Sequence, residues 1–197
     1  MLIHHNALLP LASHQESTWI SQKIQSLPMR SIEKGQRLYT EGQLFDTVYI
    51  TLSGLYRSFY IFENQEVNLR FLAGYSLLCP MSSLASLLYG GDKQKSLESI
   101  ECVSTGQVLC LPVKDFIPHP KQTDYATHLN VFNMIVFEHY LSLERRLRMI
   151  QLKRAKQRYD YFCQVMPAEI VQGMPNFHIA SYLGITPESL SRIKSKN

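Results

Sequence analysis

The sequence predicts an α+β protein in which a β-rich N-terminal part precedes a long helix and a C-terminal helical pair. Three observations support this class. Short β-type runs lie between glycines over residues 29–112, a long apolar helical segment covers 123–152, and a two-helix motif closes the chain at 177–197. The expected organisation therefore has three regions, 1–122, 123–152 and 153–197.

The β-type region has the spacing of a small barrel or sandwich, after a short helix expected over 13–27. Its runs are rich in Ile, Val, Tyr and Phe, and Gly35, Gly42, Gly54 and the polar stretch ENQE separate them at intervals of about 8–12 residues. A metal-dependent β-barrel enzyme would need histidine ligands, but residues 29–111 contain no histidine. We therefore expect no enzyme, no metal and no cofactor.

The helical segment 123–152 is apolar around more of its circumference than one neighbour would cover. A stripe of approximately heptad spacing runs along it, and a second copy of the chain is its expected partner. The interface residues expected on this stripe are Leu129, Phe132, Val136, His139, Leu143 and Ile150. A core helix within one monomer is the alternative.

The last stretch, FHIASYLGITPESLSRIKSKN, predicts two short helices joined by a tight turn. Gly184 suits a left-handed helix end, Thr186 an N-cap and Pro187 the first helical position. Leu190 and Ile193 would then be buried against the small Ala180. This is the arrangement of a helix-turn-helix whose second helix enters the DNA major groove. An ordinary helical hairpin is the alternative.

Charge and cysteine usage fit a cytoplasmic protein with an anionic partner. The net charge is +4, and residues 143–197 hold ten Lys/Arg against four Asp/Glu. A basic segment around a helix-turn-helix predicts a phosphate-binding surface. The four cysteines have no CxxC spacing, no secretory signal is visible, and no apolar run approaches the roughly 20 residues that span a bilayer.

Over nearly its whole length the chain resembles the catabolite-activator and fumarate–nitrate-regulator (Crp/Fnr) family of transcription factors. The segments EKGQRLYTEGQLFDTVYITLSGLYRSFY and IASYLGITPESLSRIKS carry the resemblance. It implies a β-roll sensor of the cyclic-nucleotide-binding type (a double-stranded β-helix) over 1–122, a dimerisation helix and a DNA-binding domain over 153–197. The residues that it implies for DNA contact are Thr186, Glu188, Ser189, Arg192, Lys194 and Lys196.

The sequence departs from the family in its nucleotide-binding segment and at its end. The family's ribose-binding Glu has no counterpart between Gly74 and Asp92, and the phosphate-binding Arg is replaced by Lys95. We therefore expect that any small-molecule effector is not cyclic AMP. The pocket residues expected from the resemblance are Leu72, Gly74, Ser82, Ser83, Lys95 and Ser96. The family's β-hairpin wing would follow the last helix, and a wingless form is expected here.

These features predict a homodimeric bacterial transcription regulator that reads a palindromic DNA site, with RNA polymerase as a further partner. The alternative is a ligand-sensing or protein-interaction dimer that no longer binds DNA. A salt series separates them, because a DNA reader displaces counterions and weakens steeply as salt rises.

Overall fold

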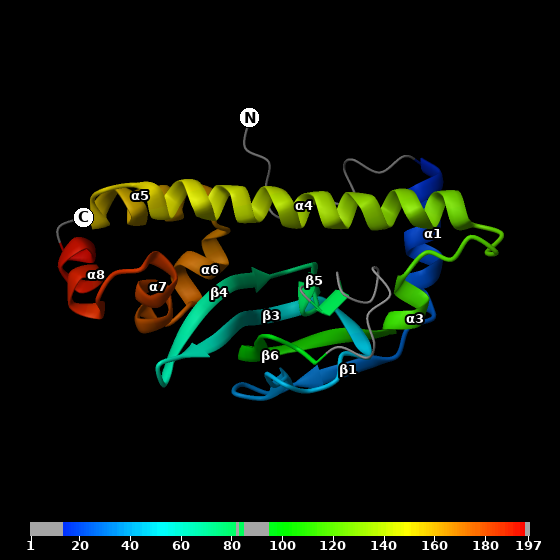
Figure 1. The fold of residues 1–197 in the computed structure, drawn as a ribbon, viewed down its shortest axis with the longest axis horizontal. Helices are drawn as coiled ribbons and strands as arrows, with labels where there is room; N and C mark the ends of the chain where they lie inside the picture. Colours follow the sequence, from blue (N-terminus) through cyan, green and yellow to red (C-terminus); the bar gives the residue numbers. More distant parts are fainter. Residues whose placement is uncertain (1–13, 82, 85–94, 196–197) are drawn as a thin grey trace.

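The computed structural model describes residues 14–81, 83–84 and 95–195. Over these residues the chain combines a six-stranded antiparallel sheet with a long helix that runs alongside it (Figure 1). A group of short helices lies at one end of the long helix, and α1 lies near its other end. The predicted α+β class, with a β-rich part followed by helices, is confirmed.

The elements follow the order that the sequence predicts. They are α1 (His14–Gln25), β1 (Met29–Ile32), β2 (Arg37–Tyr39), β3 (Thr47–Phe62), β4 (Gln65–Ala73), β5 (Ser76–Leu78), β6 (Ser99–Pro112), α3 (Val113–Phe116), α4 (Tyr125–Gln151), α5 (Ala155–Val165), α6 (Ala168–Gly173), α7 (Asn176–Leu183) and α8 (Pro187–Lys194). The helix expected over 123–152 is α4. The short helix α6 was not predicted.

Strand β3 is the centre of the sheet. It pairs with β6 along almost its whole length, with β5 near its start and with β4 over its second half, giving the order β1-β6-β3-β4. The turn from β3 to β4 has two residues, Glu63 and Asn64, both with positive φ (48° and 61°). Such a turn matches the twist of the two strands, and it lies where the sequence predicts the polar ENQE turn.

Close packing of two central strands depends on glycine at two facing positions. Gly54 on β3 and Gly106 on β6 meet backbone to backbone. A Cβ atom added to Gly106 would lie 2.2 Å from the carbonyl oxygen of Ser53 and 2.9 Å from the Cα of Gly54. Side chains cannot occupy this contact, because the atoms that they would meet are backbone and cannot rotate away.

The hydrophobic core continues from the sheet into the C-terminal helices. One cluster fills the sheet side, with Tyr39, Tyr56 and Phe132 among its buried members. A second cluster joins Phe71 of β4 to side chains from α5, α6, α7 and α8. The C-terminal helices are thus packed onto the sheet through shared buried side chains.

The contact between Gly54 and Gly106 gives a stability prediction. Gly106→Ala should lower the free energy of unfolding by about 3 kcal/mol, because the two strands must separate. Gly173→Ala is the matched control. Its Cβ would meet only the flexible tip of Leu55 at 2.6 Å, and alanine favours the helix, so the loss should stay under about 1 kcal/mol. Denaturant unfolding measures both, and equal losses would contradict the packing argument.

Candidate nucleic-acid interface

The turn between α7 and α8 has the geometry that its sequence predicts. Gly184 takes the left-handed conformation (φ 64°, ψ 41°), and the N–H of Ile185 donates to the carbonyl of Ala180 at 3.0 Å. The Thr186 hydroxyl accepts from the N–H of Ser189 at 3.2 Å, and Pro187 is the first residue of α8. These local interactions fix the angle between the two helices.

The interior of the helical pair is fully apolar. Ile179, Ala180, Leu183 and Leu190 have no exposed surface, and Ile185 and Ile193 pack against them. The prediction that α8 buries Leu190 is confirmed, and Ile193 is partly buried against the same cluster. Because α8 packs on α7 and α5, its opposite side faces away from the described core, at the end of the molecule (Figure 1).

Two charged side chains project from the outer side of α8. Glu188 and Arg192 are exposed and lie one turn apart. The pKa of Glu188 is below its usual value, first because its carboxylate accepts from its own backbone N–H at the start of the helix. Arg192 adds a smaller effect in the same direction. A guanidinium and a carboxylate on one exposed helix face can both pair with base edges.

The other residues predicted to contact DNA have different surroundings. The hydroxyls of Thr186 and Ser189 bond to each other at 3.1 Å and serve the helix cap. The ammonium group of Lys194 donates to Asn176 Oδ1 at 2.8 Å, on the neighbouring helix. Lys196 lies outside the described residues. Of this set, Arg192 thus has an outward side chain without a structural task in the cap, whereas the outward Glu188 also takes part in the cap through its own N–H and Thr186.

The basic C-terminal segment is less available than its composition suggested. Arg158 donates to the carbonyls of Leu152 at 2.8 Å and Leu183 at 3.1 Å, which ties the turn before α8 to the end of α4. Arg146 donates to backbone carbonyls of β4. These two arginines hold the domain together, so the electrostatic argument from the sequence overestimated the phosphate-binding charge.

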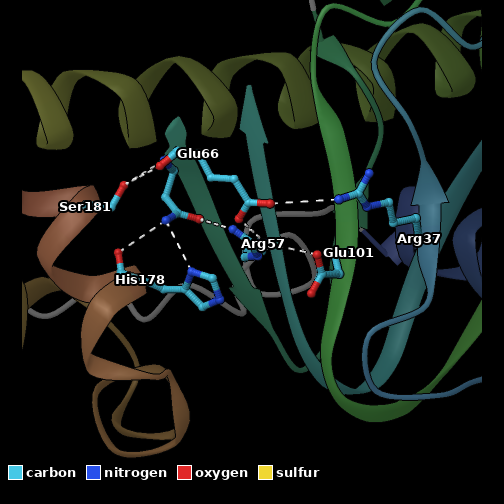
Figure 2. Close-up of polar contacts among 7 residues, drawn as sticks. Arg37, Arg57, Glu66, Glu101, His178 and Ser181 are labelled. Atoms are coloured by element: carbon cyan, nitrogen blue, oxygen red, sulfur yellow. Dashed lines mark hydrogen bonds and ion pairs between the residues drawn. The ribbon is translucent and has the colours of Figure 1, made fainter. Parts of the chain in front are cut away.

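A polar seam, defined here as Arg57, Glu66, Asn68, Glu101, His178 and Ser181, joins the sheet to α7 (Figure 2). Arg57, Asn68 and His178 are buried in it, whereas Glu66 is exposed. Arg57 Nη2 pairs with Glu66 at 2.6 Å and with Glu101 at 2.9 Å, while Nη1 donates to the side-chain oxygen of Asn68 at 3.2 Å. The amide nitrogen of Asn68 then faces α7, 3.4 Å from the carbonyl and 3.5 Å from the imidazole of His178.

The main chain of β4 completes this seam on the same side. The Ser181 hydroxyl donates to the carbonyl of Glu66 at 3.1 Å and accepts from the N–H of Asn68 at 3.2 Å. Arg146 of α4 donates to the carbonyls of Asn68 and Leu69 at 2.8 and 2.9 Å, and its guanidinium lies over the Tyr182 ring. The first helix of the pair is therefore held by β4 and α4 together.

Burial changes the protonation of His178. Its side chain is 6% exposed, and loss of water lowers its pKa to about 4, with the nearby Arg57 guanidinium adding to the effect and Glu66 opposing it. The imidazole is thus neutral at pH 7 and can accept from the Asn68 amide. Sequence analysis missed the seam; its one visible signal was an arginine within the apolar run GLYRSFY.

The predicted dimer stripe is divided between two sides of α4. Phe132 is 7% exposed and packs in the sheet-side core, and His139 is partly buried near Arg70, which together with burial holds its pKa at about 4. Phe132 thus lies on the side of α4 that covers its own sheet, and the assignment of the stripe to an interface with a second copy stays a prediction. Leu129 is half-buried, while Val136, Leu143 and Ile150 are exposed.

The structure describes five of the six residues predicted to line an effector pocket, and the pocket itself stays a prediction. Leu72 lines a cavity of about 110 Å³ between β4, β5 and α4, with Arg70, Glu138 and His139 in its wall. Ser83 and Ser96 are buried and hydrogen-bonded to main-chain carbonyls, Lys95 is exposed, and Gly74 ends a strand. Ser82 lies outside the described residues.

An ion pair occupies the interior near this cavity. Arg70 Nη2 pairs with Glu98 at 2.9 Å and donates to the carbonyl of Cys79 at 2.8 Å, and both side chains are almost fully buried. Over the described ranges, three or more His, Cys, Asp or Glu side chains are nowhere grouped to hold a metal ion. None of the described helices is both long enough and apolar enough to cross a membrane.

Comparison with solved structures identifies the fold. The chain is similar to FixK2 from Bradyrhizobium japonicum (TM-score 0.67, 18% identity, 86% of this chain and 83% of that chain). It is similar to the c-di-GMP responsive regulator CLP from Xanthomonas campestris (TM-score 0.67, 10% identity, 91% of this chain and 90% of that chain). It is also similar to the CRP-family regulator TTHB099 from Thermus thermophilus (TM-score 0.62, 14% identity, 85% of this chain and 83% of that chain). No protein-family model and no curated protein matches the chain. The chain has the Crp/Fnr-like fold.

The low pKa of His178 gives a pH prediction. The unfolded imidazole has a pKa near 6.5 and the folded one near 4, so the unfolded state binds more protons between these values. The free energy of unfolding should therefore fall as the pH drops from about 6.5 toward 4, by up to about 1.4 kcal/mol per pH unit for this group. His178→Gln should make the free energy of unfolding depend less steeply on pH in this range. His119→Gln, at an exposed site, should leave this dependence as it is in the wild type. Equal slopes in both variants, measured by denaturant unfolding, would contradict the assignment.

Proposed function

We propose that the chain is a DNA-binding transcription regulator that works as a homodimer and is not an enzyme. One observation carries the proposal: α8 presents Glu188 and Arg192 outward from a helical pair whose interior is fully buried and whose position is fixed by the sheet. A rigidly mounted helix end with an exposed guanidinium is what major-groove recognition requires. The similar solved structures are transcription regulators, which supports the same class.

The proposed division of labour follows the three regions 1–122, 123–152 and 153–197, as sensor, dimerisation helix and DNA-binding domain. Arg192 would donate two hydrogen bonds to a guanine. Glu188 would accept a hydrogen bond from a cytosine amino group or orient Arg192. Lys194 and Lys196 would contact phosphates, with Lys194 first leaving Asn176. A cytoplasmic setting and contact with RNA polymerase belong to the same proposal.

The proposed dimer surface is the outward side of α4. Its large exposed side chains are Val136, Phe137, Tyr140, Leu143, Leu147 and Ile150, each between 37% and 62% exposed. Val136, Leu143 and Ile150 form one heptad series, and Tyr140 and Leu147 form the other, at alternating steps of four and three. A surface of this pattern on a water-exposed helix is a two-stranded coiled-coil seam.

Asn133 extends the second series and is the polar member of the seam. It is exposed and lies seven residues before Tyr140. A single asparagine at such a position fixes the register and the two-stranded state of a parallel pair, because an out-of-register partner would leave its amide facing apolar side chains. Asn133 should therefore meet its counterpart in the second copy.

Cross-linking tests this dimer geometry. In a Cys163→Ser background, Asn133→Cys should form an intermolecular disulfide under mild oxidation, since facing seam positions lie within disulfide reach. Asn130→Cys, also exposed but turned about a quarter circle from the midline of the seam, is the matched control and should remain monomeric on a denaturing gel. Cross-linking at 130 but not at 133, or a wild type that sediments as a monomer at micromolar concentration, would reject the dimer.

The role of Arg192 is tested on a DNA site selected from a random library. Arg192→Ala should weaken the selected site by about 1–3 kcal/mol and relax selectivity at one base pair in each half-site. Lys194→Ala should weaken selected and random DNA alike and flatten the salt dependence. If Arg192→Ala leaves discrimination unchanged, the residue has no role in reading bases. If the wild type binds no DNA at any salt concentration, the interaction-module alternative replaces the proposal.

Cyclic AMP is not the proposed effector. Arg70 is paired with the buried Glu98 inside the sensor, and Lys95 is exposed. Among these residues, no arginine guanidinium without a carboxylate partner is available to bind a nucleotide phosphate through two hydrogen bonds. Calorimetric titration should show no micromolar binding of cyclic AMP, and a micromolar dissociation constant would overturn this part of the proposal.

A further inference from the structure

An apolar cavity of about 150 Å³ lies between α1, the sheet and α4. It adjoins the cavity that Leu72 lines, and Tyr75, Ser76, Leu77 and Ile135 line both, whereas Leu72 lines only the other one. Three layers of the fold form its wall, with Trp19 and Ile24 on α1, Ile50 and Leu111 on the sheet, and Val131 and Ile135 on α4. Trp19, Ile24, Ile50, Leu111 and Ile135 are only half-buried, so apolar surface remains open to the cavity.

The polar groups around this cavity already have partners. The Trp19 indole N–H donates to Asp124, and Lys23 pairs with the same carboxylate at 3.5 Å. His128 is 3% exposed, and its ring nitrogens lie 2.9 Å from the Phe116 carbonyl and 3.2 Å from the Gln122 side-chain oxygen. The charged residues in the described wall, Lys23 and Asp115, are exposed to solvent. A ligand therefore meets mainly apolar side chains in the interior of the cavity, while the two charged side chains of the wall are exposed to water.

We propose that this cavity is a binding site for a small uncharged apolar molecule of about the size of benzene or toluene. A cavity of about 150 Å³ lined mainly by aliphatic and aromatic side chains suits such a ligand, because most of the wall offers water no hydrogen-bond partner. Binding removes half-buried apolar surface from water on α1, the sheet and α4 at once. An anion would have to compete with Asp124 for Lys23 and would lose its hydration.

A bound molecule would connect elements that otherwise meet in few places. Val131 and Ile135 lie on the side of α4 that faces the sheet, and the exposed seam lies on the other side of the same helix. Filling the cavity would hold α1 and the sheet against α4. The use of this contact as an effector signal rests on the proposed function, whereas the binding site does not.

The chain carries its own reporter for this site. Trp19 is the only tryptophan and lies in the cavity wall. Titration with toluene should change its fluorescence saturably with one site per chain, and saturating toluene should raise the melting temperature, since it binds the folded state. Phenylacetate, with the same ring and a negative charge, should bind at least about tenfold more weakly, a difference of about 1.4 kcal/mol.

Cavity-filling variants show where toluene binds. Ile24→Phe should weaken toluene about tenfold or more by occupying the cavity, and Ile20→Phe is a second filling variant if the first does not fold. Leu72→Phe fills the other cavity and should leave toluene binding unchanged.

Three outcomes would overturn the proposed site: no saturable change with the wild type, equal loss in Leu72→Phe, or phenylacetate binding as tightly as toluene. DNA binding is measured separately in the absence of toluene. A failure of the cavity site is thereby distinguished from a failure of the proposed function.

Discussion

The buried guanidinium of Arg57 is the constraint on which the arrangement of this protein depends. The side chain is 3% exposed, and a charge removed from water must be neutralised and hydrogen-bonded. Glu66 and Glu101 supply the counter-charges from β4 and β6, and the ring of Phe59 lies 3.9 Å from the guanidinium carbon. Because Nη1 donates to the side-chain oxygen of Asn68, the amide nitrogen of Asn68 must point toward α7.

The orientation of Asn68 explains why the helical pair is part of the sheet-containing body rather than a loosely tethered domain. His178 and Ser181, one turn apart on α7, meet the polar groups of Asn68 and of the β4 main chain. Phe71 and Tyr182 stack beside them with ring centres 4.7 Å apart. Arg146 brings α4 to the same strand. Since α7 is fixed by three kinds of contact and α8 by the buried Leu190, the outward face of α8 has a defined direction.

The turn between α7 and α8 could be predicted from the sequence, whereas the contacts between elements far apart in the chain could not. Gly184, Thr186 and Pro187 act within a few residues, so the turn and its cap could be predicted from them. The spacing on α4 did not show that Phe132 is buried against the sheet and that Asn133 is exposed. Which side of a helix meets its own sheet depends on tertiary contacts. Asn68 and His178 are 110 residues apart, and nothing in either local sequence signals their contact.

Native-state hydrogen exchange measures most directly whether the polar seam joins the helical pair to the sheet. The amides of α7 should exchange as slowly as those of β4 in the wild type, because both open only with the shared core. Asn68→Ala should leave Arg57 Nη1 and the His178 imidazole without their shared partner and accelerate exchange in α7 far more than in β3. If the α7 amides exchange much faster than those of β4 in the wild type, or if Asn68→Ala leaves them unchanged, the seam does not fix the pair of helices α7 and α8.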